Sequence, residues 1–552
     1  MRKIGERMGA MVRAVVPLTS SSTRWRVRVG RRWSVRAVHG GARTRVLACA
    51  GSGSGRAPRV AVVGGGAAGL TAAWFAAEGG AAEVTVLERM REPGKKILMS
   101  GGTRCNVLPA VVDAADDFFT DSDPKRVKAI LKSWTPRACM DWLSASPRPR
   151  PPGEGEAAGG GPGTPRVEEG ERRRCDGLGL AGGVGLALEL EEASGKWFPA
   201  SNSAREVRDR LVAGCERRGV RFEYEASVEA LEAPAAGGAT AGLWTCRMRD
   251  GSTRMADTVV LATGGLSFPK VGTDGAGHRM LEALSHTVRP TYPALTPLHG
   301  PHPGGGHALA GLSTQTVVAR IAAGEGRAGG GPGAGRKSKA AKRALQANRH
   351  GWLFTHKGFS GPAVLDLSHH VVKTLEGLTP SGPDAPQGSA EVRVNWIGED
   401  RAWWVQGPLF GGGDRGGKTV LNSLKATPLP ARLAEALLAE AEVDRDTKVA
   451  QLKREDRERL LAALTEYPVP TTGHGGYALA EVTGGGVALE DVSSVTLESA
   501  THPGLFLCGE VLDVFGRIGG FNFYWAWLSG RLAGLYAAAP RGSENAQSLQ
   551  SP

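Results

Sequence analysis

The sequence predicts a mixed α/β protein whose core is a strand–helix–strand unit close to the N-terminus. A β-branched apolar run at residues 60–63 enters the glycine-rich turn GGGAAG at 64–69, and a helix-like run follows as far as Glu78. A second apolar run, residues 84–87, ends at the acidic Glu88. Together these parts have the length of about 30 residues that a βαβ unit needs.

The glycines of this turn have separate expected roles. Gly64 allows the tight turn, Gly66 lets the backbone approach a pyrophosphate, and Gly69 lets the helix pack closely on the strand. The helix N-terminus then presents free N–H groups to phosphates. Glu88 lies where a carboxylate accepts hydrogen bonds from a ribose. The unit is therefore predicted to bind a dinucleotide; by itself it does not distinguish NAD from FAD.

The positive charge of the chain is concentrated at its N-terminus. The net charge is +13, but residues 1–58 hold 13 Arg and Lys against the single acid Glu6, and the other 494 residues hold 55 basic against 54 acidic residues. An Arg- and Ser-rich segment that is almost free of acids is typical of an organelle transit peptide. We expect a chloroplast address, with a mitochondrial address and a retained basic arm as alternatives. Nucleic acid is a disfavoured partner, and no run approaches the roughly 18 apolar residues of a membrane span.

The middle of the chain alternates ordered patterns with low-complexity insertions. A basic, glycine-containing loop at 91–107 (REPGKKILMSGGTRCNV) suits wrapping around the rest of a dinucleotide. Helical patterns follow at 124–144 and 201–218, and strand-like runs at 220–224, 228–231, 244–248 and 258–261. The Pro-, Gly- and Arg-rich residues 147–190 cannot bury a core and are predicted to be a flexible insertion.

The region from residue 291 to 470 reads as an inserted β part followed by a helical part. Its basic stretch 324–349 has no aromatic residue to stack bases, so we prefer a solvated disordered loop to a nucleic-acid patch. The predicted organisation is thus a transit or disordered segment 1–58, a first nucleotide-binding part 59–290, the insert 291–470, a return segment 471–540 and a disordered tail 541–552.

The return segment bears on the choice between NAD and FAD. A short apolar strand at 504–508 ends in Gly509-Glu510, a glycine-rich turn at 516–520 follows, and a helix is predicted over 523–538. Small residues on this helix permit close packing: Ala526, Ser529, Gly530, Ala533 and Gly534. Because an NAD module needs no such distant return strand, this block favours FAD. We find no second strand–GxGxxG–helix unit for NAD(P)H, so NADH or NADPH would dock transiently as electron donor.

These blocks together resemble the BaiN-like (YhiN-like) FAD-dependent oxidoreductase family. The strings that carry the resemblance are GGGAAGL at 64–70, GKKILMSGGTRCNV at 94–107, ATGGLSFPKVGTDGAGH at 262–278, LFTHKGFSGPAVLDLS at 353–368, EVTGGGV at 481–487 and GEVLDVFGRIGGFNFYWAWLSG at 509–530. They span roughly 59–540, apart from the insertions. The resemblance implies a glutathione-reductase-type FAD domain built from both chain ends, with a barrel-like and then helical insert over the flavin.

On that resemblance, cofactor-binding residues are expected in each block. The ADP half is expected at the glycine turn and Glu88, and the isoalloxazine near the N-terminus of the last helix, whose positive end suits an anionic reduced flavin. The expected set is Gly64, Gly66, Ala67, Ala68, Gly69, Glu88, Arg89, Lys96, Gly101, Arg104, Cys105, Asn106, Val228, Thr263, Gly264, Gly509, Glu510, Asp513, Gly519, Gly520 and Asn522.

The catalytic residues are open. Cys105 is a candidate redox thiol, but no partner cysteine follows within 30 residues, so a structural thiol is favoured. The loop with His356 and Ser360 is the candidate substrate side, and Phe198, Pro269 and Tyr524 are candidate lining residues. No metal-like spacing is present. We expect an FAD-dependent oxidoreductase that reduces an activated C=C or carbonyl of a hydrophobic small molecule with NAD(P)H. An FAD-containing RNA-modifying or RNA-associated protein and a non-catalytic flavin-binding regulator are the alternatives.

Overall fold

The computed structural model describes residues 56–147, 182–235, 242–322, 348–378, 390–409 and 417–540, together with three short strands between residues 26 and 48. The chain divides into two compact units, residues 57–539 and a smaller unit made of both chain ends. Most of the predicted flexible segments (147–190, 324–349) and all of the tail 541–552 lie outside the described residues.

The smaller unit holds one antiparallel sheet. Its strands are β1 (Arg26–Val29), β2 (Trp33–Val38) and β3 (Arg45–Ala48), paired in that order. This sheet differs from the expectation of a segment without folded elements. The sequence RVRV of β1 alternates basic and β-branched residues, which is a pattern compatible with a strand.

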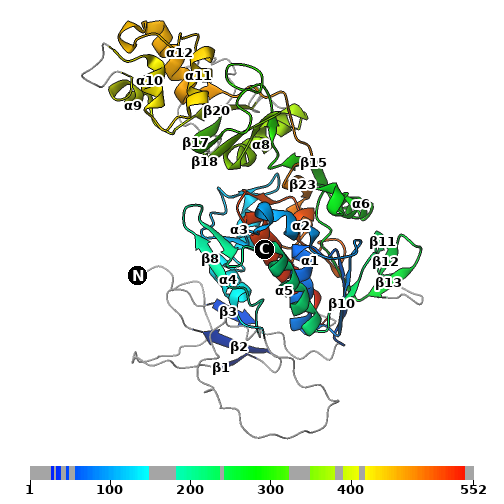
Figure 1. The fold of residues 1–552 in the computed structure, drawn as a ribbon. Coiled ribbons are helices and arrows are strands. Elements are labelled where there is room, and N and C mark those ends of the chain that lie inside the picture. The colour runs from blue at the N-terminus through cyan, green and yellow to red at the C-terminus, as the bar shows by residue number, and fades with distance from the viewer. Residues whose placement is uncertain are drawn as a thin grey trace, which may run out of the picture. The chain divides into compact units, whose positions relative to one another are not determined.

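The main unit is built on a five-stranded parallel sheet in the order β10-β5-β4-β14-β24 (Figure 1). The strands are β4 (Arg59–Val63), β5 (Glu83–Leu87), β10 (Arg221–Glu223), β14 (Thr258–Leu261) and β24 (Leu505–Leu507). They are rich in buried β-branched residues, as expected for a sheet covered on both faces. Since β24 pairs with β14 across about 240 residues of sequence, the predicted core from both chain ends is confirmed.

Two long helices pack unusually closely beside this sheet. These are α1 (Ala67–Glu78) and α13 (Phe521–Ala537), and α5 (Ala204–Arg217) lies against α1. A Cβ added at Gly530 would lie 2.4 Å from the carbonyl oxygen of Ala68, and one at Gly534 would lie 2.2 Å from that of Ala72. The predicted close packing of the last helix through small residues is therefore confirmed.

Smaller elements surround this core. The predicted helix 124–144 is two helices, because Pro136 cannot continue the first one and the Thr135 hydroxyl caps the second. The remaining elements of this part are α2 (Lys95–Met99), α3 (Pro124–Leu131), α4 (Pro136–Ser144), α6 (Ala276–Ala283), β6 (Leu108–Pro109), β7 (Phe118–Phe119), β8 (Leu188–Glu191), β9 (Lys196–Pro199), β11 (Val228–Glu232), β12 (Trp244–Met248), β13 (Thr253–Ala256) and β25 (Phe515–Gly516).

The insert contains a seven-stranded antiparallel sheet in the order β21-β20-β17-β18-β19-β16-β22. Its strands are β16 (Leu298–His299), β17 (Ser313–Ala322), β18 (Asn348–Thr355), β19 (Gly358–Ser360), β20 (Glu391–Asn395), β21 (Tyr467–Pro468) and β22 (Gly473–His474). Within the described residues β21 and β22 do not pair with each other, so the sheet is open where the resemblance implied a barrel-like form.

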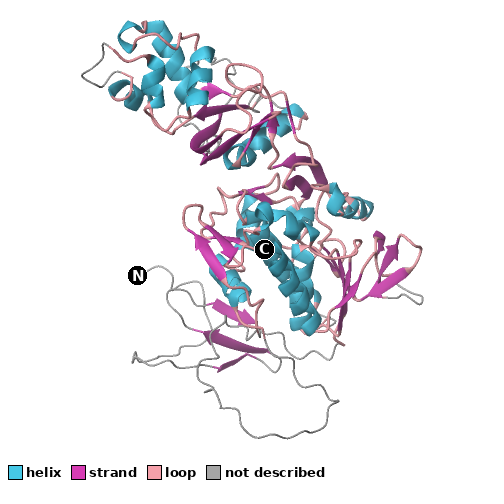
Figure 2. Ribbon diagram, in the orientation of Figure 1, coloured by secondary structure: helices cyan, strands magenta, loops and turns pink. Residues whose placement is uncertain are grey.

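Helices alternate with the strands of the insert and gather at one end of it (Figure 2), with α8 (Pro362–Leu375) between β19 and β20 and four described helices between β20 and β21. Helix α8 packs on the sheet, and it is followed by α9 (Arg401–Gln406), α10 (Val420–Lys425), α11 (Ala431–Glu440) and α12 (Arg454–Thr465). The buried apolar residues of the insert form a cluster separate from that around the parallel sheet. The chain passes between these two regions through the antiparallel pair β15 (Val288–Ala294) and β23 (Val482–Val487).

Candidate functional site

A cavity of about 570 Å³ opens at the carboxyl ends of the parallel strands. Val63, Leu87 and Ala262, which end or directly follow three adjacent strands, all line it. Ligands of open α/β sheets bind at this edge because the loops there diverge and leave a crevice. The N-termini of α1 and α13 also reach the cavity, through Gly66 and Gly520.

The glycine turn at the start of α1 is shaped by close backbone contacts. Gly64 has φ +103°, and a Cβ there would lie 2.6 Å from the carbonyl oxygen of Ala262. A Cβ at Gly69 would lie 1.9 Å from the carbonyl oxygen of Gly64. By contrast, no atom lies within 4 Å of a Cβ placed on Gly66. Gly64 and Gly69 are thus required by the fold, while the backbone at Gly66 is left open to the cavity.

Glu88 is held in place by the backbone. Its carboxylate accepts hydrogen bonds from the N–H of Gly65 at 2.7 Å and of Met90 at 2.8 Å, and the residue is only 8% exposed. Burial raises its pKa, against the effect of these hydrogen bonds. Two carboxylate oxygens offer about four acceptor positions, so two hydrogen bonds leave capacity for a ligand hydroxyl. Glu88 lines the cavity, as a ribose-binding carboxylate must.

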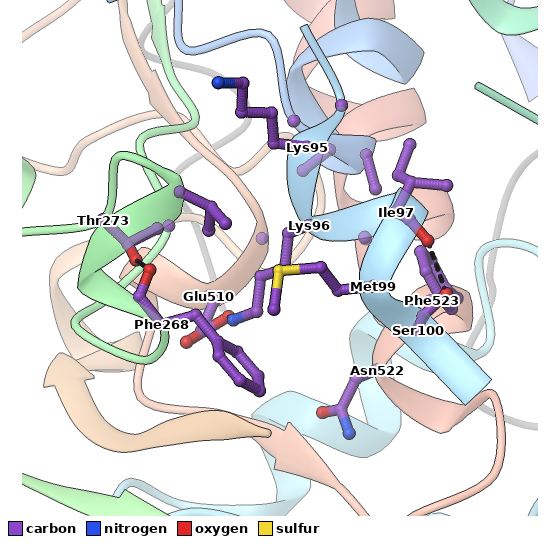
Figure 3. A pocket seen from close by; sticks show the side chains of 18 of the residues that line it. Lys95, Lys96, Ile97, Met99, Ser100, Phe268, Thr273, Glu510, Asn522 and Phe523 are labelled. Atoms are coloured by element: carbon purple, nitrogen blue, oxygen red, sulfur yellow. Dashed lines mark hydrogen bonds and ion pairs between the residues drawn. The ribbon is translucent and has the colours of Figure 1, made fainter. Parts of the chain in front are cut away.

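A half-buried ion pair lines the cavity. Lys96 Nζ lies 2.6 Å from Glu510 Oε2 and 2.5 Å from Ser267 Oγ, and Glu510 also accepts the N–H of Thr483 at 2.9 Å. Burial alone would raise the pKa of Glu510, but the Lys96 ammonium and these hydrogen bonds hold it below its ordinary value. Figure 3 shows Lys96 directed toward Glu510, with Met99 and other side chains around the same space. This pair joins the first and last segments of the sequence at the site.

The loop between α2 and β6 has a left-handed backbone. Gly101 and Gly102 have φ of +54° and +63°, and Cys105, a residue with a side chain, has φ +60°. Cys105 is 0% exposed and does not line the cavity. Burial raises its pKa to about 12. The sulfur of Cys105 is thus enclosed and neutral, which fits the favoured structural thiol, and its place near the cofactor stays a prediction.

Most of the residues predicted for the cofactor meet at this cavity. The exceptions are Gly69, Cys105 and Asp513. Those that line it are Gly64, Gly66, Ala67, Ala68, Glu88, Arg89, Lys96, Gly101, Arg104, Asn106, Val228, Thr263, Gly264, Gly509, Glu510, Gly519, Gly520 and Asn522.

Asp513 is placed elsewhere by its hydrogen bonds. Its carboxylate accepts from the hydroxyls of Thr120 and Ser122 and from the N–H of Asp121, at 2.8 to 3.2 Å, and pairs with Arg289 at 3.3 Å. Asp513 does not line the cavity, and its place beside the cofactor stays a prediction. Its side chain fixes the segment around residue 121 instead.

The two candidates for the substrate side, His356 and Ser360, lie outside this cavity. His356 is exposed in the turn between β18 and β19, Ser360 ends β19, and neither lines the cavity. Of the candidate lining residues, Phe198 does line it, whereas Pro269 and Tyr524 do not.

The sequence analysis missed several lining residues, among them Lys196, Met99, Phe268, Asp274 and Ile518. No motif marks Lys196. Its strand β9 reaches the cavity because it pairs with β6, directly after the loop at 100–106.

The chain was compared with known proteins. A family model described as HI0933-like protein Rossmann domain matches residues 58–149 and 179–536. The chain belongs to this HI0933-like family. The family is one of FAD-binding oxidoreductases, so the protein is a flavin-dependent oxidoreductase, as predicted.

The relatives of this chain carry names that state different substrates. The ribosomal RNA dihydrouridine synthase of Escherichia coli is 30% identical over 473 residues, covering 85% of this chain and 95% of the relative. The 3-dehydro-bile acid delta(4,6)-reductase of Clostridium scindens is 29% identical, covering 87% and 99%. A solved 3-ketosteroid-delta4-(5alpha)-dehydrogenase from Rhodococcus jostii has a TM-score of 0.39 at 16% identity, covering 87% and 97%. That last likeness carries no functional argument.

The cavity residues fit the FAD that the family binds. The open backbone at Gly66 leaves room for a pyrophosphate at a helix N-terminus, and Glu88 keeps free acceptor positions for a ribose. Among the described residues, no helix has the length and hydropathy of a membrane span, and no three His, Cys, Asp or Glu side chains are arranged to hold a metal ion.

Proposed function

We propose that this enzyme saturates a carbon–carbon double bond conjugated to a carbonyl, with electrons that a reduced nicotinamide delivers to the FAD. The observation that carries the proposal is the mixed lining of the cavity, where Arg104 lies 4.1 Å from the ring of Phe198 and Lys196 lies beside Gly519, next to the apolar Ile518. Such a lining suits a flat, conjugated acceptor with a polar oxygen. The names of the relatives support it, since a dihydrouridine synthase and a delta(4,6)-reductase both saturate activated double bonds.

We assign the cofactor to the residues along the cavity. Gly66, Ala67 and the start of α1 would hold the pyrophosphate, and Glu88 the adenosine ribose. Gly519, Gly520 and the start of α13 would lie at the isoalloxazine. When bound, FAD supplies hydride chemistry; the chain binds and orients it and excludes water. The described cysteines, Cys105 included, are all free and buried. None of them offers an accessible thiol at this site for a disulfide cycle.

Uridine in ribosomal RNA is the first substrate to test. Two of the relatives, from Escherichia coli and Haemophilus influenzae, carry the name ribosomal RNA dihydrouridine synthase, and the chain covers 95% of each. A hydrophobic small molecule is the second candidate, which the apolar side chains Phe198, Ile518 and Phe523 at the cavity favour. Uracil and an unsaturated ketone both contain a carbon–carbon double bond conjugated to a carbonyl, so the same reaction at this site would reduce either one.

The experiment separates these substrates. The purified full-length protein is reduced anaerobically with NADPH or NADH and then mixed with unmodified ribosomal RNA transcribed in vitro or with a 4-ene-3-ketosteroid. We expect loss of the oxidised-flavin absorbance and then a product that is heavier by two hydrogens, in the RNA arm. Product only with the steroid would move the assignment to small molecules. A protein without flavin, or a reduced flavin that neither acceptor oxidises, would refute the proposal.

We also propose that the protein works in the chloroplast. The Arg-rich segment 1–58 supports this, and a mitochondrial location is the alternative. Fractionation followed by N-terminal sequencing of the mature protein tests it. A mature protein that still begins at Met1 would contradict a cleaved transit peptide.

A further inference from the structure

Lys196 enters the cavity next to the N-terminus of α13. It is the first residue of β9, and its side chain runs over Gly519, where an added Cβ would lie 2.5 Å from Lys196 Cε. Gly519 has φ +119°, a conformation that favours glycine in any case. Because Gly519 has no side chain, the Lys196 side chain can pass over its backbone and line the cavity.

The ammonium of Lys196 is not paired with any described residue, in contrast to the cationic groups of Lys96 and Arg104 in the same cavity. Lys96 is taken up by Glu510 and Ser267, and Arg104 by Glu191, by Asn202 and by the ring of Phe198, 4.1 Å away. Within the described part of the chain, Lys196 Nζ makes no hydrogen bond and no ion pair. Lys196 is half-buried, and the three N–H donors of its ammonium are left for an acceptor on a bound ligand.

The charged groups around Lys196 are committed to other partners. They are Glu191 on β8, Asp366 on α8, His350 on β18 and Arg517 before α13. Asp366 accepts from the N–H of Ile518 at 2.7 Å and from Arg517 at 3.2 Å, and Glu191 accepts from Arg104. Burial lowers the pKa of Lys196, while Asp366 and Glu191 oppose that effect without contacting the ammonium.

We propose that Lys196 donates a hydrogen bond to the carbonyl oxygen of the acceptor and stabilises the negative charge that forms there. This inference rests on the proposed function. With reduced FAD bound, a hydride would be supplied to the β-carbon of the acceptor, where a C–H bond forms as the π bond breaks. The electron pair moves through the α-carbon to the carbonyl oxygen, which becomes an enolate held by Lys196. The α-carbon then takes a proton from water, the carbonyl re-forms, and the ammonium keeps its own protons.

The test uses a stable mimic of that enolate, the 4-nitrophenolate ion, with full-length holoprotein. Binding is followed by the change in the flavin spectrum, which does not depend on turnover. Lys196→Met should weaken 4-nitrophenolate binding about 10- to 100-fold, the worth of one charge-assisted hydrogen bond. Lys196→Arg should retain most of it. Lys132→Met, an exposed lysine outside the cavity, is the matched control and should bind as the wild type.

Turnover and pH supply the second measurement. Lys196→Met should lower kcat with the accepted substrate about 10²- to 10³-fold and leave the rate of flavin reduction by the nicotinamide unchanged. In the wild type, kcat should fall at high pH as Lys196 deprotonates, and Lys196→Arg should move that fall upward. If the wild type turned over neither substrate, the proposed function would be refuted, but the 4-nitrophenolate binding experiment would still test the role of Lys196. No 4-nitrophenolate binding to wild type, or equal binding to Lys196→Met, would overturn the role of Lys196, as would a variant that changes only flavin reduction.

Discussion

The contact between α1 and α13 makes a quantitative prediction at Gly534. A methyl group there would lie 2.2 Å from the carbonyl oxygen of Ala72 and 2.9 Å from its carbon, both backbone atoms that no rotamer change can move away. Forcing extra volume into packed elements costs about 1–3 kcal/mol. Alanine recovers about 1 kcal/mol of helix propensity relative to glycine. Gly534→Ala should therefore destabilise by roughly 1 kcal/mol and Gly534→Val by about 3 kcal/mol, because valine adds more volume and recovers less propensity.

The assay is thermal unfolding together with FAD retention after gel filtration. Both helices begin at the cavity, so moving them apart should also weaken cofactor binding. Gly417→Ala, at a glycine whose Cβ would meet nothing within 4 Å, is the control. Adding Ala72→Gly to Gly534→Ala should give no rescue, because the carbonyl of residue 72 remains. Full rescue, or a Gly534→Val protein as stable as the wild type, would refute the argument from backbone contact.

Three further predictions concern single side chains. Cys105→Ala should keep kcat within about twofold, since the thiol is enclosed and its pKa is raised to about 12; a loss of turnover with FAD still bound would contradict this. Glu88→Gln should weaken FAD binding about 10-fold, measured by fluorescence titration, through loss of a charged acceptor; unchanged affinity would remove Glu88 from the ribose site. Burial raises the pKa of Asp366 to about 6, so the folded protein holds this proton more tightly than the unfolded chain, and the stability it contributes is present below about pH 4 and lost as the pH rises through 6. Asp366→Asn should flatten that part of the stability profile in urea denaturation, and an unchanged profile would argue against it.

Local patterns predicted the framework of this protein well. The helix from the glycine turn to Glu78 and the strand at 258–261 have the predicted ends, because period and glycine placement are properties of a few neighbouring residues. The break at Pro136 was also visible in the sequence, yet the apolar spacing around it read as one helix.

Side-chain direction at the site was harder to predict. Asp513 follows a cofactor-lining strand end, but its hydrogen bonds to Thr120 and Ser122, nearly 400 residues earlier, turn it away from the cavity. Lys196 has no motif, and only the pairing of β9 with β6 brings it in. Such placements depend on contacts between distant segments, which no local period reports.

The pairing of β14 with β24 determines when the cavity can form during synthesis of the chain. About 240 residues separate these adjacent strands, and a ribosome adds about 5–20 residues each second, so the first strands wait roughly 10–50 s for their partner. The insert, in which three of the six strand pairs join consecutive strands, is synthesised during that interval. Residues 505–537 then supply β24 and α13, and only with them do both helix ends meet at the cavity. The cavity is thus completed by segments that are made after the insert.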